Sequence, residues 1–133
     1  MPNLDASFSG NIFHVDHPMI IAQNRRLATI LPVRLAYSSS GYSAGTVLAR
    51  NSVSGEYAAY DNGASSGLDT AKAVLFENIN SSEFGSTTGS TLARAIFGGE
   101  VYKDKLVGLD SNAETDLDAK TIVDATGVNV LKF

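Results

Sequence analysis

The stretch TVLARNSVSGEYAAYD, residues 46–61, decides the fold class. TVLARN, residues 46–51, predicts a short strand, because apolar residues are bounded by turn-forming ones. SVSG, residues 52–55, predicts a turn that returns the chain into EYAAYD, residues 56–61. The stretch therefore predicts a β-hairpin.

Downstream of this hairpin the chain continues in the same manner. LDTAKAVLFENI, residues 68–79, has an apolar centre without clean alternation, which fits a strand buried on both faces and leaves a short helix as the alternative. LARAIFGGEVYKDKL, residues 92–106, predicts two strands joined as a hairpin at Gly98-Gly99, since glycine adopts positive φ at little steric cost.

Upstream of residue 46, aliphatic residues gather between His17 and Ala36, with Pro18 and Pro32 among them. Proline has no N–H for a β-ladder, so edge strands or strand ends are expected here. Runs rich in Gly, Ser and Asn predict the connecting loops, at residues 37–45, 62–67 and 80–90.

One helix is expected near the carboxyl end. Ser111 and Glu114 have the spacing of a capping box, which predicts a helix over residues 113–125. Gly127 is placed for a left-handed C-cap, and GVNVLKF, residues 127–133, predicts a closing strand. The sequence therefore predicts a mainly β fold with a short C-terminal helix and a small barrel or sandwich-like body.

Residues 1–17 differ from the rest and predict a flexible N-terminal arm before one β-rich domain over residues 18–133. They are polar and turn-rich, with isolated apolar side chains and no strand or helix period. Apolar residues on such an arm bury in a partner or fold back onto their own domain. The candidate binding residues are Leu4, Phe8, Ile12, Phe13, His14 and Val15.

The composition limits which classes of function the chain can have. The chain has 133 residues, one ordinary domain, with 18% charged residues and a net charge of −4. No basic stripe offers phosphate contacts, so no nucleic-acid partner is expected. No apolar run is long enough for a membrane span, and the N-terminus lacks signal-peptide features, so we expect synthesis in the cytoplasm and no membrane partner. There is no cysteine.

Few residues of the sequence are candidates for a metal site or a catalytic site. His14, Asp16 and His17 are the one histidine cluster, but Pro18 favours an extended chain that points neighbours apart, so no metal or other cofactor is expected. Six carboxylates of the last third occupy hairpin and helix-start positions that usually face water, which disfavours acid–base catalysis. They are Glu100, Asp104, Asp110, Glu114, Asp116 and Asp118. No nucleophile elbow or phosphate-binding loop occurs, and the sequence predicts no enzyme.

The order of these segments resembles a known family. The chain resembles the lambda-type bacteriophage head decoration proteins in a series of runs that occur in the same order. These runs are AGTVLAR (44–50), SGEY (54–57), ASSG (64–67), AKAVL (71–75), LARAIFGGEVY (92–102) and DAKTIVDATGVNVL (118–131). The resemblance covers residues 18–133 and is a pattern of elements rather than an invariant signature.

The resemblance implies a non-enzymatic structural protein of the virion. It implies a homotrimer on the outer surface of the capsid, stabilising the shell, with the major capsid protein as partner. The arm would engage that protein, a role carried over by position because residues 1–17 do not match residue by residue. The alternative is another phage or bacterial surface β-module, a tail or adhesion domain that binds a ligand or receptor.

Overall fold

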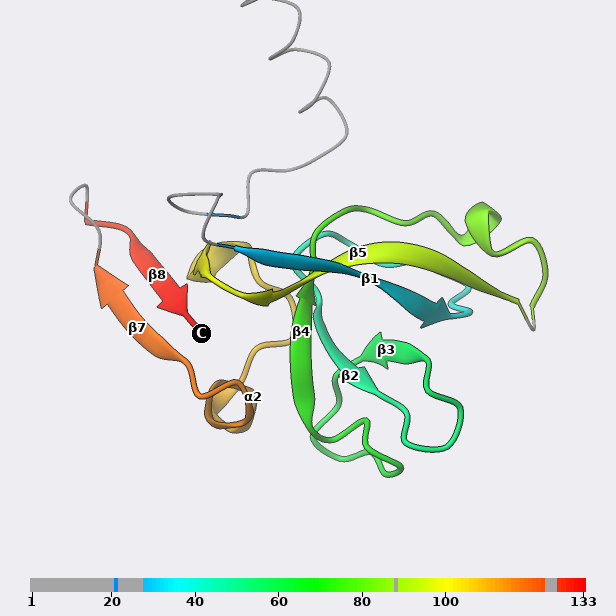
Figure 1. Ribbon diagram of the computed structural model, residues 1–133, viewed down its shortest axis with the longest axis horizontal. Helices are drawn as coiled ribbons and strands as arrows, with labels where there is room; N and C mark the ends of the chain where they lie inside the picture. Colours follow the sequence, from blue (N-terminus) through cyan, green and yellow to red (C-terminus); the bar gives the residue numbers. More distant parts are fainter. Residues whose placement is uncertain (1–20, 22–27, 88, 124–126) are drawn as a thin grey trace, which may run out of the picture.

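The fold is mainly β, as the sequence predicts (Figure 1). The computed structural model describes residue 21 and residues 28–87, 89–123 and 127–133. Five strands close into a barrel in the order β1-β3-β2-β4-β5. They are β1 (Thr29–Ala36), β2 (Val47–Arg50), β3 (Tyr57–Ala59), β4 (Ala71–Leu75) and β5 (Ser90–Gly98).

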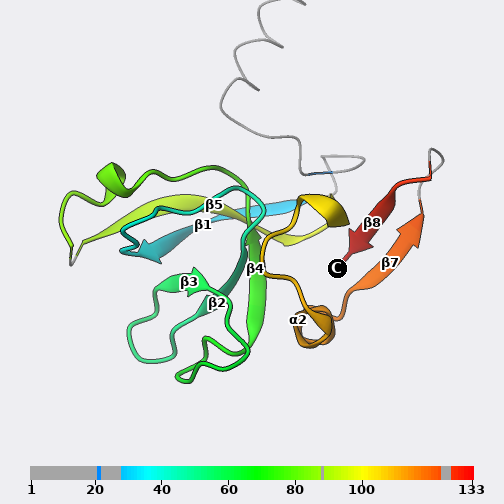
Figure 2. The ribbon, with the colours of Figure 1, turned by 180° about the vertical axis from the view of Figure 1, so that it is seen from behind.

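A second, three-stranded sheet lies to one side of the barrel in the order β6-β8-β7, as both ribbon views show (Figures 1 and 2). Its strands are β6 (Glu100–Tyr102), β7 (Lys120–Val123) and β8 (Asn129–Lys132). The described chain adds one α-helix, α2 (Ser111–Asp116), and two 3-10 turns, η2 (Ser81–Phe84) and η3 (Lys103–Lys105). The predicted barrel with a short late helix is thus confirmed.

The predicted hairpin is formed by β2 and β3. The two strands are antiparallel, with Leu48 opposite Ala59. The side-chain oxygen of Asn51 accepts hydrogen bonds from the N–H groups of Val53 and Ser54, at 2.8 and 3.1 Å, which fixes the turn. The tip that carries Val53 is therefore held by its own hydrogen bonds.

The segment with two interpretations, residues 68–79, contains strand β4 and no helix. Apart from Lys72, every residue of β4 is buried. Ala73 and Leu75 point into the barrel, whereas Val74 points outward beneath the second sheet. Burial on both faces explains why the sequence shows no alternation here.

Three apolar clusters hold these layers together. The barrel interior consists of Val33, Leu35, Leu48, Ala73, Leu75, Ile79, Phe84, Ala93 and Ala95. The cluster between barrel and second sheet consists of Ile21, Val74, Phe76, Ile96, Val101 and Leu131. The cluster between barrel and α2 consists of Val47, Ala49, Tyr60, Ala71 and Ala113.

Pro32 was expected on an edge strand or at a strand end, but it lies inside β1, a strand of the closed barrel, on a stretch that is paired on one side only. Its partner on β5 is Arg94, whose backbone oxygen accepts from Phe76 N at 2.9 Å and whose backbone N–H donates to Glu77 at 2.8 Å. Arg94 therefore turns its backbone groups toward β4, and Pro32 turns its own away from β5. The missing N–H falls on the side where β1 pairs with β3 only at Leu35.

The hairpin expected at Gly98-Gly99 is not formed, because β5 and β6 belong to different sheets. Gly99 has φ 135° and exchanges two backbone hydrogen bonds with Phe133, at 2.8 and 2.9 Å. The glycine pair thus passes the chain from the barrel into the second sheet. A turn dipeptide specifies the local bend, while the partner of the next strand is set by tertiary packing.

The predicted helix over residues 113–125 is wrong in its start and its length. Asp110, not Ser111, is the N-cap, and its Oδ1 accepts from Ala113 N at 2.7 Å. The helix ends at Asp116, and Lys120–Val123 form β7 instead. Thr121, Ile122 and Val123 are β-branched, and pairing with β8 outweighs the helical spacing.

Gly127 has the expected positive φ, 90°, but lies between β7 and β8 and not at a helix end. The closing strand predicted over residues 127–133 is present as β8. The arm, residues 1–17, lies outside the described residues, so the division into arm and domain remains an expectation.

Candidate interaction surfaces

The six residues predicted to bind a partner, Leu4, Phe8, Ile12, Phe13, His14 and Val15, lie outside the described residues. So do His14, Asp16 and His17 of the histidine cluster. The described residue nearest to them in the chain is Ile21, which is buried and forms an antiparallel bridge with Val101 of β6.

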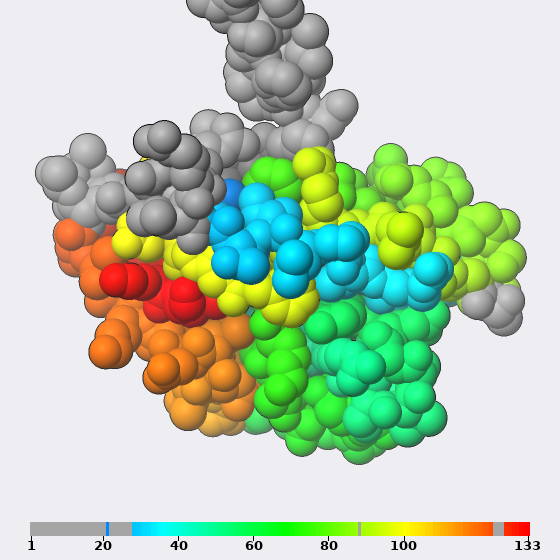
Figure 3. Space-filling view, viewed as in Figure 1, coloured from blue at the N-terminus to red at the C-terminus, as the bar shows by residue number. Residues whose placement is uncertain are grey.

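A second surface, the barrel face, is the outward side of β1 and β5. Register places Pro32 opposite Arg94 and Arg34 opposite Leu92. In Figure 3 the cyan atoms of β1 and the yellow atoms of β5 lie side by side across this side of the molecule. Leu92 is 62% exposed, so the barrel face presents a large apolar side chain to solvent.

The two arginines of the barrel face are held differently. Arg94 is fixed by Glu77, with a 3.3 Å contact from Nη2 to Oε1, and its guanidinium lies 5.1 Å from the Phe76 ring centre. Arg34 donates to Ser90 Oγ at 3.1 Å and forms no ion pair among the described residues. Arg34 is therefore a cation that a partner's carboxylate can bind.

Sequence reasoning missed the barrel face, although a signal for it exists. Residues 92–95 alternate between exposed Leu92 and Arg94 and buried Ala93 and Ala95. A strand that turns leucine and arginine outward and alanine inward has its larger side chains on the solvent side. The small alanines fit the narrow interior of a five-stranded barrel.

Three of the six carboxylates of the last third, Asp110, Glu114 and Asp116, have structural partners, whereas Oε1 of Glu100 is buried without a hydrogen-bond partner among the described residues. Asp110 caps α2 and also accepts from the Tyr60 hydroxyl, with 3.0 Å to Oδ1. Asp116 accepts from Ala71 N at 2.9 Å, and Glu114 lies 3.4 Å from Lys103 Nζ. These contacts attach α2 to the barrel.

Tyr60 lies near the carboxylates of Asp69, Asp110 and Asp116, which together form the acidic end of the barrel. Burial raises the pKa of Tyr60 to about 12, and the hydrogen bond to Asp110 and the charges of Asp110, Asp116 and Asp69 add to the increase. The ring is 8% exposed, and its hydroxyl donates to Asp110 Oδ1 at 3.0 Å. A phenol kept protonated there serves as a hydrogen-bond donor.

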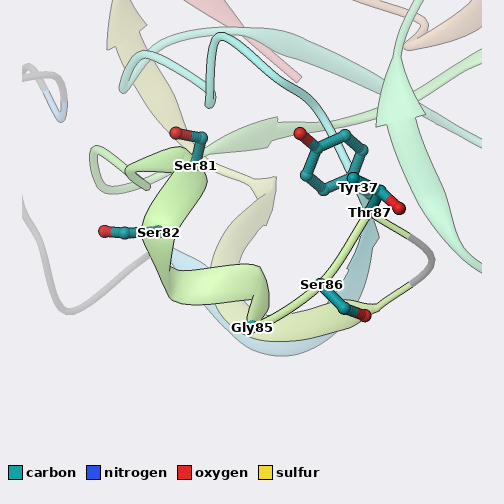
Figure 4. Close-up of a pocket in the computed structure, with 6 residues that line it drawn as sticks. All are labelled: Tyr37, Ser81, Ser82, Gly85, Ser86 and Thr87. Carbon is teal, nitrogen blue, oxygen red and sulfur yellow. The ribbon is translucent and has the colours of Figure 1, made fainter.

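A shallow depression of about 200 Å³ lies beside η2 (Figure 4). Its lining is Tyr37, Ser81, Ser82, Gly85, Ser86 and Thr87. In Figure 4 the Tyr37 ring points toward Ser81, whereas Ser82 points away from it. The lining contains no carboxylate, imidazole or amine, so it offers no acid–base pair and no metal ligands.

Among the described residues, no group of three or more His, Cys, Asp or Glu side chains is arranged to hold a metal ion. Nor does any helix in this part of the chain have the length and apolar character needed to cross a membrane.

The fold and these surfaces define a small β-barrel protein whose described surface features are suited to contacts with other macromolecules. A family model for bacteriophage lambda head decoration protein D matches residues 24–128. The chain therefore belongs to the lambda head decoration protein D family, a family of structural proteins of the phage capsid. No curated protein and no solved structure gives a significant match to the chain.

Proposed function

We propose that this protein assembles as a homotrimer on the outer surface of a phage capsid, binds the major capsid protein through its arm and stabilises the shell. The observation that carries the proposal is the family match over residues 24–128, most of the barrel and the second sheet. Family membership supports a place on the virion, and synthesis in the host cytoplasm is part of the proposal.

The surfaces of the barrel support assembly into a ring. A ring of three copies joins two different surfaces at each contact. The barrel face is one such surface, with exposed Leu92 and with Arg34, which forms no ion pair among the described residues. The acidic end around Tyr60, with Asp69 and Asp116, has the complementary charge. We propose that the barrel face of one copy contacts the acidic end of the next.

The arm is the proposed capsid contact. Ile12-Phe13-His14-Val15 has strong β preference, so its backbone can pair with a strand edge of the major capsid protein. Ordering such an arm costs about 1–2 kcal/mol per residue, so one arm binds weakly. Three arms on one trimer raise the strength of attachment through their effective concentration.

The test is deletion of residues 1–17 from the full chain. We expect thermal melting and oligomeric state to stay nearly unchanged, while binding to undecorated, expanded capsids of the cognate phage falls severely. If the shortened protein binds these capsids as well as the full chain, the arm is not the attachment site. A full-length protein that stays monomeric both free and on capsids contradicts the trimer.

A further inference from the structure

Strand β7 forms an outer edge of the second sheet. In the part of the chain that the structure describes, β7 pairs with β8 alone, and both ribbon views show no described element along its other side (Figures 1 and 2). All four of its residues are exposed, Val123 to 65%. The β7 edge is therefore accessible to another strand.

The hydrogen-bond pattern shows how β8 divides its backbone between its two neighbours. Gly99 and Phe133 donate to each other, at 2.8 and 2.9 Å, so Phe133 bonds toward β6. Backbone groups of a strand alternate in direction, residue by residue. The odd-numbered residues of β8 therefore bond to β6, and the even-numbered residues bond to β7.

This pattern places the backbone groups of β7 as well. Lys120 and Ile122 stand opposite the even-numbered residues of β8, so their N–H and C=O groups bond inward. Thr121 and Val123 consequently direct their N–H and C=O groups outward. Two residues of this strand thus present donors and acceptors for a further strand.

The β7 edge lacks most of the features that protect exposed strands. Free edges are usually blocked by short length, proline, a bulge, charged side chains or a covering segment, and of these β7 has a length of four residues and one charge. Thr121, Ile122 and Val123 are all β-branched, and the register with β8 is unbroken. Lys120, at the start, is the one charged residue of the strand. Such an edge favours strand addition.

A row of charged side chains crosses the second sheet on one face. Register places Lys132 opposite Glu100 on one side and opposite Lys120 on the other. Like charges opposite each other destabilise a sheet. A carboxylate next to Lys120 on an added strand would balance this pair, so the edge suits an acidic segment.

We infer that the β7 edge is a second capsid-binding element, which takes up an extended segment of the major capsid protein carrying a carboxylate beside Lys120. The inference rests on the proposed function. Ile21 bridges Val101 of β6, at the opposite edge of the same three-stranded sheet, so a protein held on the capsid through its N-terminal segment brings this sheet toward the capsid surface. Pairing of β7 with β7 of another copy has two-fold symmetry and does not build a trimer.

The test substitutes proline at the outward positions of the full-length chain. Val123→Pro and Thr121→Pro each remove one outward N–H and leave the bonds to β8 in place, and Thr121→Pro also removes the hydroxyl that accepts from Lys103 Nζ at 3.0 Å. We expect each to weaken binding to undecorated, expanded capsids about tenfold, with a nearly unchanged far-UV spectrum. Val123→Thr is the matched control, since it keeps the N–H and the β-branched shape, and we expect binding within about twofold of wild type.

The outcomes separate the two proposals. Capsid binding by Val123→Pro at wild-type strength overturns the role of β7, and an equal loss in Val123→Thr shows a side-chain contact instead of strand addition. A change in self-association without a change in capsid binding assigns the edge to another copy and also overturns the inference. If the wild-type protein itself does not bind capsids, the proposed function fails.

Discussion

The hydroxyl of Tyr60 donates to Oδ1 of Asp110 at 3.0 Å, and the same oxygen accepts from Ala113 N at 2.7 Å. One carboxylate thus caps α2 and binds the residue that follows β3, fifty positions earlier in the chain. This contact joins the barrel to the segment that leads into the second sheet.

The contact predicts a loss of stability at high pH. The folded pKa of Tyr60, about 12, lies above its ordinary value of 10.0, so the folded state keeps a proton that the unfolded state releases. The stabilisation is complete below pH 10 and is lost as the pH rises toward 12. Urea unfolding at intervals from pH 8 to pH 11.5 measures it.

Tyr60→Phe is the control for this pH dependence. We expect the variant to be less stable than wild type at pH 8 and the difference to shrink as the pH rises. Tyr42, whose pKa is raised by burial and by Glu56, is present in both proteins and cancels in the comparison. A difference that is constant from pH 8 to pH 11.5 contradicts the role given to the Tyr60 proton.

The cap of α2 can be tested by two neighbouring substitutions. Asp110→Ala removes the N-cap and the acceptor of Tyr60, and we expect a loss of about 1 kcal/mol or more in the free energy of unfolding. Ser111→Ala should change it by less than about 0.5 kcal/mol, because the hydroxyl of Ser111 makes no hydrogen bond among the described residues. Chemical denaturation measures both. Equal losses would place the cap at Ser111 after all.

These two residues show where sequence reasoning succeeded and where it stopped. Turn composition and short apolar runs correctly predicted the β2–β3 hairpin and β4, because local preference and tertiary structure agree there. The N-cap was placed one residue late because Asp110 and Ser111 are both good N-caps, and spacing alone favoured Ser111. The hydrogen bond between Asp110 and Tyr60 joins residues fifty positions apart, so no local sequence pattern predicts it.

The second sheet was the harder part to predict. Residues 120–123 satisfy both a helical spacing and a β-branched composition, and pairing with β8 decides between them. Likewise, the outward position of Leu92 depends on which face of β5 closes the barrel. Alternation identifies two faces, and the neighbouring strands determine which one is buried.

A close backbone approach predicts different costs at two glycines. Gly45 and Gly127 both have positive φ, 92° and 90°. A Cβ on Gly45 would lie 2.2 Å from the backbone oxygen of Lys105, whereas one on Gly127 would have nothing within 4 Å. Gly127→Ala should therefore cost about 1–2 kcal/mol for its φ alone. Gly45→Ala should cost roughly 1–3 kcal/mol more. Thermal unfolding of both variants checks the order, and an equal cost would mean that the Gly45 loop moves freely.

The proposed trimer predicts that Leu92→Asp separates the subunits. Leu92 is exposed on the barrel face, so an aspartate there leaves the fold of one copy intact. In the proposed contact the new carboxylate would meet the acidic end of the next copy, around Asp69 and Asp116, and like charges repel.

Mass photometry or sedimentation at micromolar concentration should show three chains of 14.0 kDa for wild type and single chains for Leu92→Asp. Val53→Asp is the control, because Val53 is 85% exposed at the tip of the β2–β3 turn and is not among the residues that define the two proposed surfaces. This variant adds the same charge to the chain as Leu92→Asp, and we expect it to remain trimeric.

Arg34→Glu should weaken the trimer as well. High salt should weaken the wild-type trimer, because salt screens the attraction between Arg34 and the acidic end. Trimers of Leu92→Asp as stable as wild type would show that the subunits meet elsewhere.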